Sequence, residues 1–349
     1  MPKVSVIGHF GNGKTLLNGQ TVKTKIITDA LEDKLGKCEV MKIDTYGGIK
    51  NIFKAPFQVF SAFAHCANIV IFPAHNGLRV YVPLMTFLSH FFKNRKLHYV
   101  VIGGWLADFV KERRLLAKRL KKFDGIYVET DTMKKALELQ GFSNVYVMPN
   151  CKKLTVLSED ELVYPSGVPY RLCTFSRVMK EKGIETAVNA VKSVNKELGY
   201  TAYSLDIYGQ VDASQTDWFE KLQKTFPDYI RYGGLVAFDK SVETLKEYFA
   251  LLFPTYYEGE GFAGTLIDAY SAGVPVIASD WKYNTELVTQ QTGYIFPARD
   301  EQAISEILKA AAENPKMISD KKPLCLEEAH KYAPGRVIQI LTDNLKEGK

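Results

Sequence analysis

The stretch YYEGEGFAGTLIDAYSAGVPVIASD, residues 256–280, holds two carboxylates eight positions apart on either side of a glycine-bearing loop. Glu260 precedes the loop, and Asp268 lies one turn into a helix that we expect over residues 265–271. Carboxylates placed in this way can face one cleft and hydrogen-bond sugar hydroxyls, while the loop amides and the helix dipole favour phosphate. An ordinary strand-loop-helix with surface acids would not explain Gly261, Gly264 and Gly273, each of which marks a backbone constraint.

A second stretch, FSRVMKEKGIETAVNAV, residues 175–191, joins a buried strand to a helix through a short polar turn. Arg177 and Lys182 bracket the turn. Two cations beside a helix N-terminus, with the amides of Gly183 and Ile184 close by, suit a diphosphate. Taken alone, the stretch is better explained as a helix start with solvated charges.

Apolar strand candidates alternate with amphipathic helix candidates, which predicts an α/β fold with parallel sheets covered by helices. The first series of strands is VSVIG, CEVMKID, NIVIFPA, LHYVVIG, GIYVET and VYVMPN. After a polar, proline-bearing passage, the second series is RLCTFS, SLDIYG, IRYGG, LLFPT, PVIAS and TGYIF. We therefore predict two doubly wound domains, residues 1–165 and 166–330, and a final helix within residues 331–349.

One motif favours another class of enzyme. Residues 8–15, in SVIGHFGNGKT, match the phosphate-binding P-loop of NTPases, which follows a strand and opens a helix. The strand is present, but residues 18–19 form an Asn-Gly turn pair that would break the helix. The candidates for a magnesium-binding aspartate, Asp44 and Asp206, are weak. We interpret the segment as a long glycine-rich loop and keep the P-loop NTPase as an alternative.

Composition sets limits on the class of protein. The chain has 349 residues and is 46% hydrophobic, which is enough for two domain cores. Neither end resembles a signal segment, and no stretch reaches the roughly 18 apolar residues of a membrane span, so we expect a cytoplasmic protein. The five cysteines contain no C-x-x-C pair, which argues against a zinc site or a disulfide framework.

Charge is distributed unevenly along the chain. Residues 1–161 hold 24 Lys and Arg against 14 Asp and Glu, whereas the remainder holds 21 against 25. The excess peaks in KERRLLAKRLKK, residues 111–122, which fits either an anionic membrane surface or a solvated helix face around a core contact. The apolar segment RVYVPLMTFLSHFF is similarly a core helix or a membrane contact. Because the excess is modest and no nucleic-acid module is recognised, we expect no nucleic-acid partner.

Four segments together resemble the retaining GT-B glycosyltransferases of family four. SRVMKEKG resembles the family's arginine-to-EKG segment, and EGFAGTLIDAYSAGVPVIASD resembles its E-x7-E segment. VYVMPN resembles the strand that closes the first domain, and NGQTVKTKIITDAL resembles the first helix. The likeness is specific in the C-terminal half and loose over the first 150 residues. It implies two Rossmann-like domains facing a central cleft, acceptor side first and nucleotide-sugar side second, with the C-terminal helix crossing back.

The resemblance also implies roles for individual residues. Arg177 and Lys182 would hold the donor diphosphate and stabilise it as a leaving group, and Glu260 would contact the donor sugar. Asp268 stands where the family usually has glutamate, and would hold the ribose hydroxyls with one methylene less reach. Backbone atoms would approach the sugar and phosphates at Gly11, Gly13, Phe262, Ala263, Gly264 and Thr265.

The family often supplies a histidine from a first-domain loop, and here that loop reads Gly103-Gly104-Trp105 instead. His75, in FPAHNGLR, is the nearest substitute as a catalytic residue, although a lone histidine is more often structural. Trp105 would either stack on a sugar face or pack against its neighbours.

The implied reaction moves a hexose from a UDP- or GDP-linked sugar to a hydroxyl of a glycan acceptor, with retention of configuration by front-face attack. No Asp-x-Asp occurs in the chain, so we expect neither a metal nor a cofactor. A lipid-linked acceptor in surface polysaccharide synthesis would suit the basic first domain, which would bind peripherally to an anionic inner membrane face.

Three alternatives belong to other classes. A P-loop NTPase would bind a magnesium nucleoside triphosphate through Lys14. A non-catalytic nucleotide-sugar binding module would keep Arg177, Lys182 and Glu260 but lack the first-domain catalytic group. A Rossmann dehydrogenase has less support, since no G-x-G-x-x-G follows an early strand.

Overall fold

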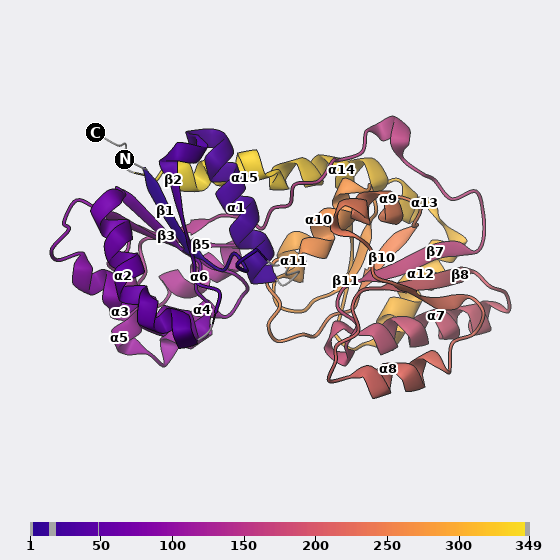
Figure 1. The fold of residues 1–349 in the computed structure, drawn as a ribbon. Coiled ribbons are helices and arrows are strands. Elements are labelled where there is room, and N and C mark those ends of the chain that lie inside the picture. Colours follow the sequence, from indigo (N-terminus) through magenta and orange to yellow (C-terminus); the bar gives the residue numbers. More distant parts are fainter. Residues whose placement is uncertain (1–2, 14–18, 48, 346–349) are drawn as a thin grey trace. The chain divides into compact units, whose positions relative to one another are not determined.

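The computed structural model describes residues 3–13, 19–47 and 49–345, and the chain divides into two compact units (Figure 1). Unit 1 comprises residues 1–153 and 333–349, and unit 2 comprises residues 154–332. The sequence analysis assigns residues 154–165 to the first domain. The structure assigns them to unit 2, because Leu157 is buried in the unit 2 core and its amide donates to the Ser271 carbonyl.

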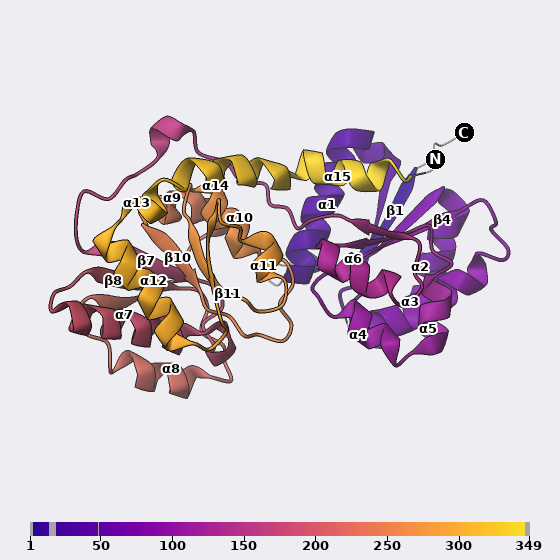
Figure 2. The same ribbon diagram turned by 180° about the vertical axis from the view of Figure 1, so that it is seen from behind.

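Unit 1 is built on a parallel sheet with the strand order β2-β1-β3-β4-β5-β6. The strands are β1 (Val4–Gly8), β2 (Val40–Asp44), β3 (Asn68–Ile71), β4 (Lys96–Val100), β5 (Gly125–Val128) and β6 (Val145–Val147). The helices are α1 (Gly19–Leu35), α2 (Ile49–His65), α3 (His75–Leu88), α4 (Leu106–Lys111), α5 (Arg114–Leu120), α6 (Asp131–Glu138) and α15 (Pro334–Thr342). The last helix, α15, packs against α1, as the view from behind also shows (Figure 2).

Unit 2 has a second parallel sheet, with the order β12-β11-β10-β7-β8-β9. Its strands are β7 (Tyr170–Phe175), β8 (Tyr203–Tyr208), β9 (Ile230–Gly234), β10 (Ala250–Phe253), β11 (Val276–Ser279) and β12 (Gly293–Phe296). Its helices are α7 (Ile184–Leu198), α8 (Thr216–Gln223), α9 (Ser241–Leu245), α10 (Gly264–Ser271), α11 (Asn284–Leu287), α12 (Glu301–Glu313), α13 (Lys316–Ser319) and α14 (Lys322–Ala329).

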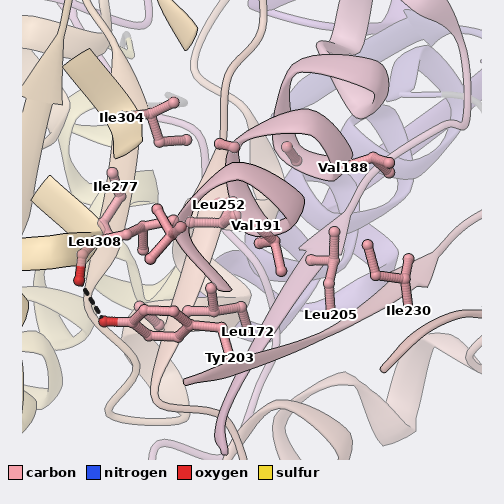
Figure 3. Close-up of a cluster of buried hydrophobic side chains, with 14 of the residues drawn as sticks. Leu172, Val188, Val191, Tyr203, Leu205, Ile230, Leu252, Ile277, Ile304 and Leu308 are labelled. Atoms are coloured by element: carbon pink, nitrogen blue, oxygen red, sulfur yellow. Dashed lines mark hydrogen bonds between the residues drawn. The ribbon is translucent and has the colours of Figure 1, made fainter. Parts of the chain in front are cut away.

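One face of the unit 2 sheet is held by α7 and α12. In Figure 3, Val188 and Val191 of α7 and Ile304 of α12 lie over the strand residues Leu172, Leu205 and Leu252. The hydroxyl of Tyr203 reaches across this core and donates to the Leu308 carbonyl at 2.6 Å, so the buried phenol is satisfied. A core packed in this way holds the strand ends, and the loops that leave them, in fixed positions.

The expected fold class is confirmed, since every expected strand is present and both sheets are parallel and doubly wound. In such a sheet the strand order reverses between two neighbouring strands, and a crevice forms at the carboxyl ends of these two strands. These strands are β1 and β3 in unit 1, and β7 and β10 in unit 2. The first helix, α1, begins at Gly19, which agrees to within one residue with a glycine-rich loop that ends at the Asn-Gly pair.

The apolar segment 79–92 and the basic segment 111–122 of unit 1 contribute helices that have one side buried in the core. In α5, Leu116 and Leu120 are buried while Leu115 is exposed. In α3, Val82 and Met85 are buried. No helix among the described residues combines the length and the apolar character needed to cross a bilayer.

A buried lysine fixes the far end of α10. Lys322, fully buried in α14, donates from Nζ to the carbonyls of Tyr248 at 3.0 Å and Gly273 at 3.3 Å, just beyond the end of α10. Burial lowers the pKa of Lys322 from 10.5 to about 8, because the low-dielectric interior disfavours the ammonium form. The amine therefore secures α10 while adding a charge that the folded state tolerates poorly near neutral pH.

This predicts a pH-dependent stability difference between the wild type and Lys322→Met. Because the folded pKa is depressed, the unfolded chain binds more protons between pH 8 and 10.5, so stability rises with pH in that window. From pH 8 to 9.5 the wild type should gain about 2 kcal/mol of unfolding free energy relative to the variant. Urea unfolding of both proteins at the two pH values measures it, and a pH-independent difference would contradict the buried-ammonium account.

Candidate functional site

Residues from two distant sequence segments meet at the carboxyl ends of β7 and β10 in unit 2. After β7 the chain forms a short 3-10 helix, η3 (Lys180–Lys182), and enters α7. After β10 it forms the loop 254–263 and enters α10. The two loops are joined directly, since the Tyr256 amide donates to the Glu181 carbonyl at 2.7 Å. The sheet's central strands therefore bring together the two stretches that the sequence analysis selected.

Lys182 and Glu260 form the centre of this site. Nζ of Lys182 lies 2.6 Å from Oε2 of Glu260, and their side chains are only 12% and 7% exposed. The same Oε2 accepts a hydrogen bond from the hydroxyl of buried Thr255 at 2.7 Å. The ammonium also lies 5.0 Å from the centre of the Tyr257 ring. This is a mostly buried ion pair with a third, hydroxyl, partner at the edge of a sheet, where ligands bind in doubly wound folds.

Gly183 allows the two loops to approach so closely. Its φ is +71°, in the left-handed region, and it caps the start of α7. A Cβ at this position would lie 2.1 Å from the Pro254 carbonyl oxygen, so only glycine fits without moving the backbone.

Arg177 lies at the edge of the same site and is solvated. Its side chain is 56% exposed and its guanidinium lies 3.6 Å from Asp212, rather than against Glu260. Hydrogen bonds from Ser214 are the main cause of the lowered pKa of Asp212, and Arg177 adds a smaller contribution. The guanidinium is therefore held only by an exposed ion pair and can turn toward an anionic ligand.

Asp268 is positioned differently from Glu260. It is buried in α10, and its Oδ1 accepts a hydrogen bond from the hydroxyl of Ser241, at the start of α9, at 2.8 Å. In this structure the Asp268 carboxylate, which the resemblance assigns to the ribose hydroxyls, therefore accepts a hydrogen bond from the Ser241 hydroxyl instead.

The loop before α10 is anchored at both ends. Phe262 is buried, with its ring edge-on to Tyr332 at 4.8 Å between centroids. The hydroxyl of Thr265 donates to the Phe175 carbonyl, the last residue of β7, at 2.6 Å. Ala263 is the N-cap of the helix and Gly264 its first residue, so their amides lie at the positive end of the helix dipole.

In unit 1, Gly11 and Gly13 lie in the loop after β1, with φ values of 86° and 80°. Asp44, at the end of β2, holds this loop by accepting hydrogen bonds from the backbone amides of Phe10 at 2.9 Å and Asn12 at 2.7 Å. Its oxygens are thus engaged by the loop, which disfavours Asp44 as a magnesium ligand. Lys14 and Thr15, which complete the P-loop pattern, lie outside the described residues.

His75 follows β3 as the first residue of α3 and stacks on Trp105, with ring centroids 3.8 Å apart. The Trp105 indole donates to the Ile102 carbonyl at 2.8 Å, so this ring packs within its own unit. The pKa of His75 is lowered by desolvation first, and then by the charges of Arg79 and Arg113. The imidazole is therefore neutral near pH 7, and an exposed His75 presents a hydrogen-bonding group rather than a charge.

Thr255 is a residue of the candidate site that sequence reasoning missed. Its only signal is its place two residues after a buried strand, within a loop already rich in candidates. Sequence reasoning also missed a buried ion pair in unit 1, between Lys23 and Glu129, whose Nζ and Oε1 atoms are 2.5 Å apart. Among the described residues, no group of three or more His, Cys, Asp and Glu is arranged to hold a metal ion.

Comparisons with known proteins support the reading of unit 2. Residues 169–314 match the family model described as glycosyl transferases group 1. The GtfA subunit of a UDP-N-acetylglucosamine–peptide N-acetylglucosaminyltransferase from Streptococcus gordonii is 29% identical over 201 residues, which is 55% of this chain and 37% of that protein. The amylovoran biosynthesis glycosyltransferase AmsK of Erwinia amylovora is 26% identical over 145 residues, 40% of this chain and 35% of that protein. The chain thus spans little more than a third of the length of these relatives.

The fold is shared over the full chain. The crystal structure of Anabaena Alr3699/HepE in complex with UDP and glucose superimposes with a TM-score of 0.73 over 99% of both chains, at 13% identity. This likeness establishes the GT-B architecture. The family match adds that residues 169–314, within unit 2, are similar to group 1 glycosyl transferases.

The close approach at Gly183 can be tested by substitution, with the glycine at the other end of α7 as the control. Gly199 caps the other end of α7, has a similar φ of +76°, and has open space where a Cβ would lie. Gly199→Ala should cost about 1–2 kcal/mol from left-handed strain alone. Gly183→Ala should cost at least about 3 kcal/mol, because the clash with Pro254 adds to that strain. Equal losses in urea unfolding would show that the close approach does not constrain the site.

Proposed function

We propose that this GT-B protein is a glycosyltransferase that moves a hexose from a nucleoside-diphosphate sugar, UDP- or GDP-linked, to a hydroxyl of a glycan acceptor. The observation that carries the proposal is the mostly buried Lys182–Glu260 pair at the carboxyl ends of β7 and β10, within the family-matched segment. The names of the streptococcal relative and of the Anabaena structure both refer to UDP or a UDP-sugar, so UDP is the nucleotide we favour for the donor.

The donor diphosphate would bind where the cations and helix N-termini converge. Nζ of Lys182 would exchange its contact with Glu260 for a contact with a phosphate oxygen. Arg177 would leave its exposed ion pair with Asp212 and bind a second phosphate oxygen. The amides at the start of α7 and α10 add their positive dipole ends. Side chains and helix dipoles would thus neutralise the diphosphate without a metal or another cofactor.

Glu260 would then bind the sugar. Lys182 and Thr255 both bind Oε2, and we assign Oε1 to a hydroxyl of the donor hexose. Asp268 would exchange its hydrogen bond with Ser241 for the ribose hydroxyls, a like-for-like replacement of one hydroxyl donor by others. The backbone at Phe262, Ala263, Gly264 and Thr265 would approach the sugar and phosphates.

The proposed reaction breaks the bond between the anomeric carbon and the diphosphate oxygen. A bond forms between the acceptor oxygen and the same face of that carbon, so configuration is retained. The acceptor proton passes to the departing phosphate oxygen, and the nucleoside diphosphate leaves with the negative charge that Arg177 and Lys182 stabilise. We extend the proposal to Gly11 and Gly13 as phosphate contacts and to neutral His75 as a hydrogen-bonding group.

The proposed acceptor is a lipid-linked glycan in surface polysaccharide synthesis, at the inner face of an anionic membrane. Support comes from the name of AmsK, which refers to the biosynthesis of the polysaccharide amylovoran, and from the basic first half of the chain. No nucleic acid is involved in the proposed reaction.

Ligand binding tests the donor class. Thermal melting should be measured with UDP, GDP, their common sugars and magnesium ATP, with and without EDTA. A ligand present at 100 times its Kd adds about 2.7 kcal/mol to the unfolding free energy. UDP and its sugar should therefore raise the Tm, and because no metal is needed the increase should be the same with and without EDTA. Stabilisation by magnesium ATP alone would restore the P-loop reading and overturn the proposal.

Substitutions test the leaving-group role, with a matched lysine as control. Lys182→Ala and Arg177→Ala should each lower kcat for transfer by roughly 100-fold, since one contact to a developing oxyanion contributes about 3 kcal/mol. Lys180→Ala removes an equal charge from the same 3-10 helix, where Nζ lies 5.9 Å from the Trp218 ring centre, and should keep nearly full activity. Donor binding without transfer or hydrolysis in the wild type would favour the non-catalytic module.

A further inference from the structure

Unit 1 exposes phenylalanines on two adjacent helical segments. Phe53, Phe57 and Phe60 of α2 are 76%, 80% and 53% exposed, and Phe87 and Phe91, at and beyond the end of α3, are 61% and 71% exposed. We call these five residues the aromatic face. Side chains of this size are seldom left in water without a purpose, and a large apolar patch marks an interaction surface.

The two helical segments that carry the aromatic face pack against each other. The α2 residues are spaced four and three positions apart, on one side of the helix. Phe60 lies edge-on to Phe92 at 5.8 Å, and Phe87 lies edge-on to Phe91 at 5.3 Å. The helices α2 and α3 pack together, with α5 beside α3 (Figure 1).

The opposite side of α2 is already occupied. Ala55, Val59, Ala62 and Phe63 are fully buried in unit 1. Apolar side chains therefore lie on the inner side and on part of the outer side of the helix, and the inner side accounts for the folding of the unit without the outer phenylalanines. An outer apolar stripe on a helix that is already packed calls for a second apolar environment.

The sequence segment that carries the aromatic face has charges of one sign. Residues 45–107, which contain β3, β4 and all of α2 and α3, hold no aspartate or glutamate. The cations Lys54, Arg79 and Lys93 are exposed in the same region. Phenylalanines beside lysine and arginine, with acids excluded, are the composition of a segment that lies in the interface of an anionic bilayer.

We propose that the aromatic face docks unit 1 onto an anionic phospholipid membrane. The phenylalanine rings enter the boundary between headgroups and acyl chains, and Lys54, Arg79 and Lys93 pair with the headgroups. A second copy of this chain fits the face less well, because a symmetric contact would set these cations against their own copies. The basic helix α5, whose Leu115 is 74% exposed, extends the same surface.

This inference rests on the proposed function only for its purpose, which is to hold the enzyme where a lipid-linked acceptor lies. It differs from the sequence-based expectation in its location. The sequence suggested a membrane contact at the basic segment 111–122 and at the apolar segment 79–92. The structure adds α2, and it shows that Phe87 and Phe91 are exposed within the apolar segment.

The test is co-sedimentation of the full chain with phosphatidylcholine vesicles that contain about one third phosphatidylglycerol, an anionic lipid, and with vesicles of phosphatidylcholine alone. The wild type should bind the anionic vesicles, more weakly at high salt. Phe53→Ser/Phe57→Ser should lower the partition coefficient at least about tenfold. Leu139→Ser, at an 89% exposed leucine after α6 in the same unit, is the matched control and should bind like the wild type.

Several results would overturn the proposal. One is failure of the wild type to bind anionic vesicles, and another is full binding by the double variant. A third is a wild-type oligomer in solution that the double variant dissociates, since this would make the face a protein interface. The melting temperature of each variant checks its folding. Stabilisation by UDP, measured on the same samples, separates this surface from the donor site, because the double variant should keep it.

Discussion

The ion pair between Lys182 and Glu260 joins the two halves of the unit 2 sheet. Lys182 follows β7 and Glu260 follows β10, so the pair forms only because these central strands are neighbours. Removing one partner of such a pair leaves a charge desolvated, at a cost of about 3–5 kcal/mol. A ligand able to separate the two must offer anionic oxygens to the lysine and hydroxyls to the carboxylate. A sugar diphosphate carries both groups in one molecule.

The close approach at Gly183 and the buried Thr255 support this pair. Gly183 lets the η3 loop touch the loop after β10, and the Thr255 hydroxyl fixes which oxygen of Glu260 faces the lysine. The corresponding edge of unit 1 is held differently. There Asp44 binds backbone amides of the glycine-rich loop, and His75 stacks on Trp105. The Asp44 carboxylate thus shapes a loop whose sequence matches a P-loop, and the oxygens of Asp44 accept hydrogen bonds from backbone amides of that loop.

The two units also differ in what they expose. Unit 2 concentrates charged side chains at its strand ends, whereas unit 1 exposes phenylalanines on α2 and beyond α3 within a region free of acids. A chain whose candidate catalytic charges and exposed apolar surface lie in different units can change one without disturbing the other. This separation is why the proposed donor binding and the proposed membrane binding are independently measurable.

The sequence by itself determined the strands, the doubly wound class and the two stretches of the unit 2 site, because hydrophobic runs, glycines and charges at helix starts are local signals. It placed the domain boundary too late, because Leu157 is buried against residues more than a hundred positions away. Only the tertiary structure decided that Lys182 pairs with Glu260 and that Asp268 is buried beside Ser241. It alone also separated exposed Phe57 from buried Phe63, since α2 is apolar on both sides and its sequence does not say which side meets the core.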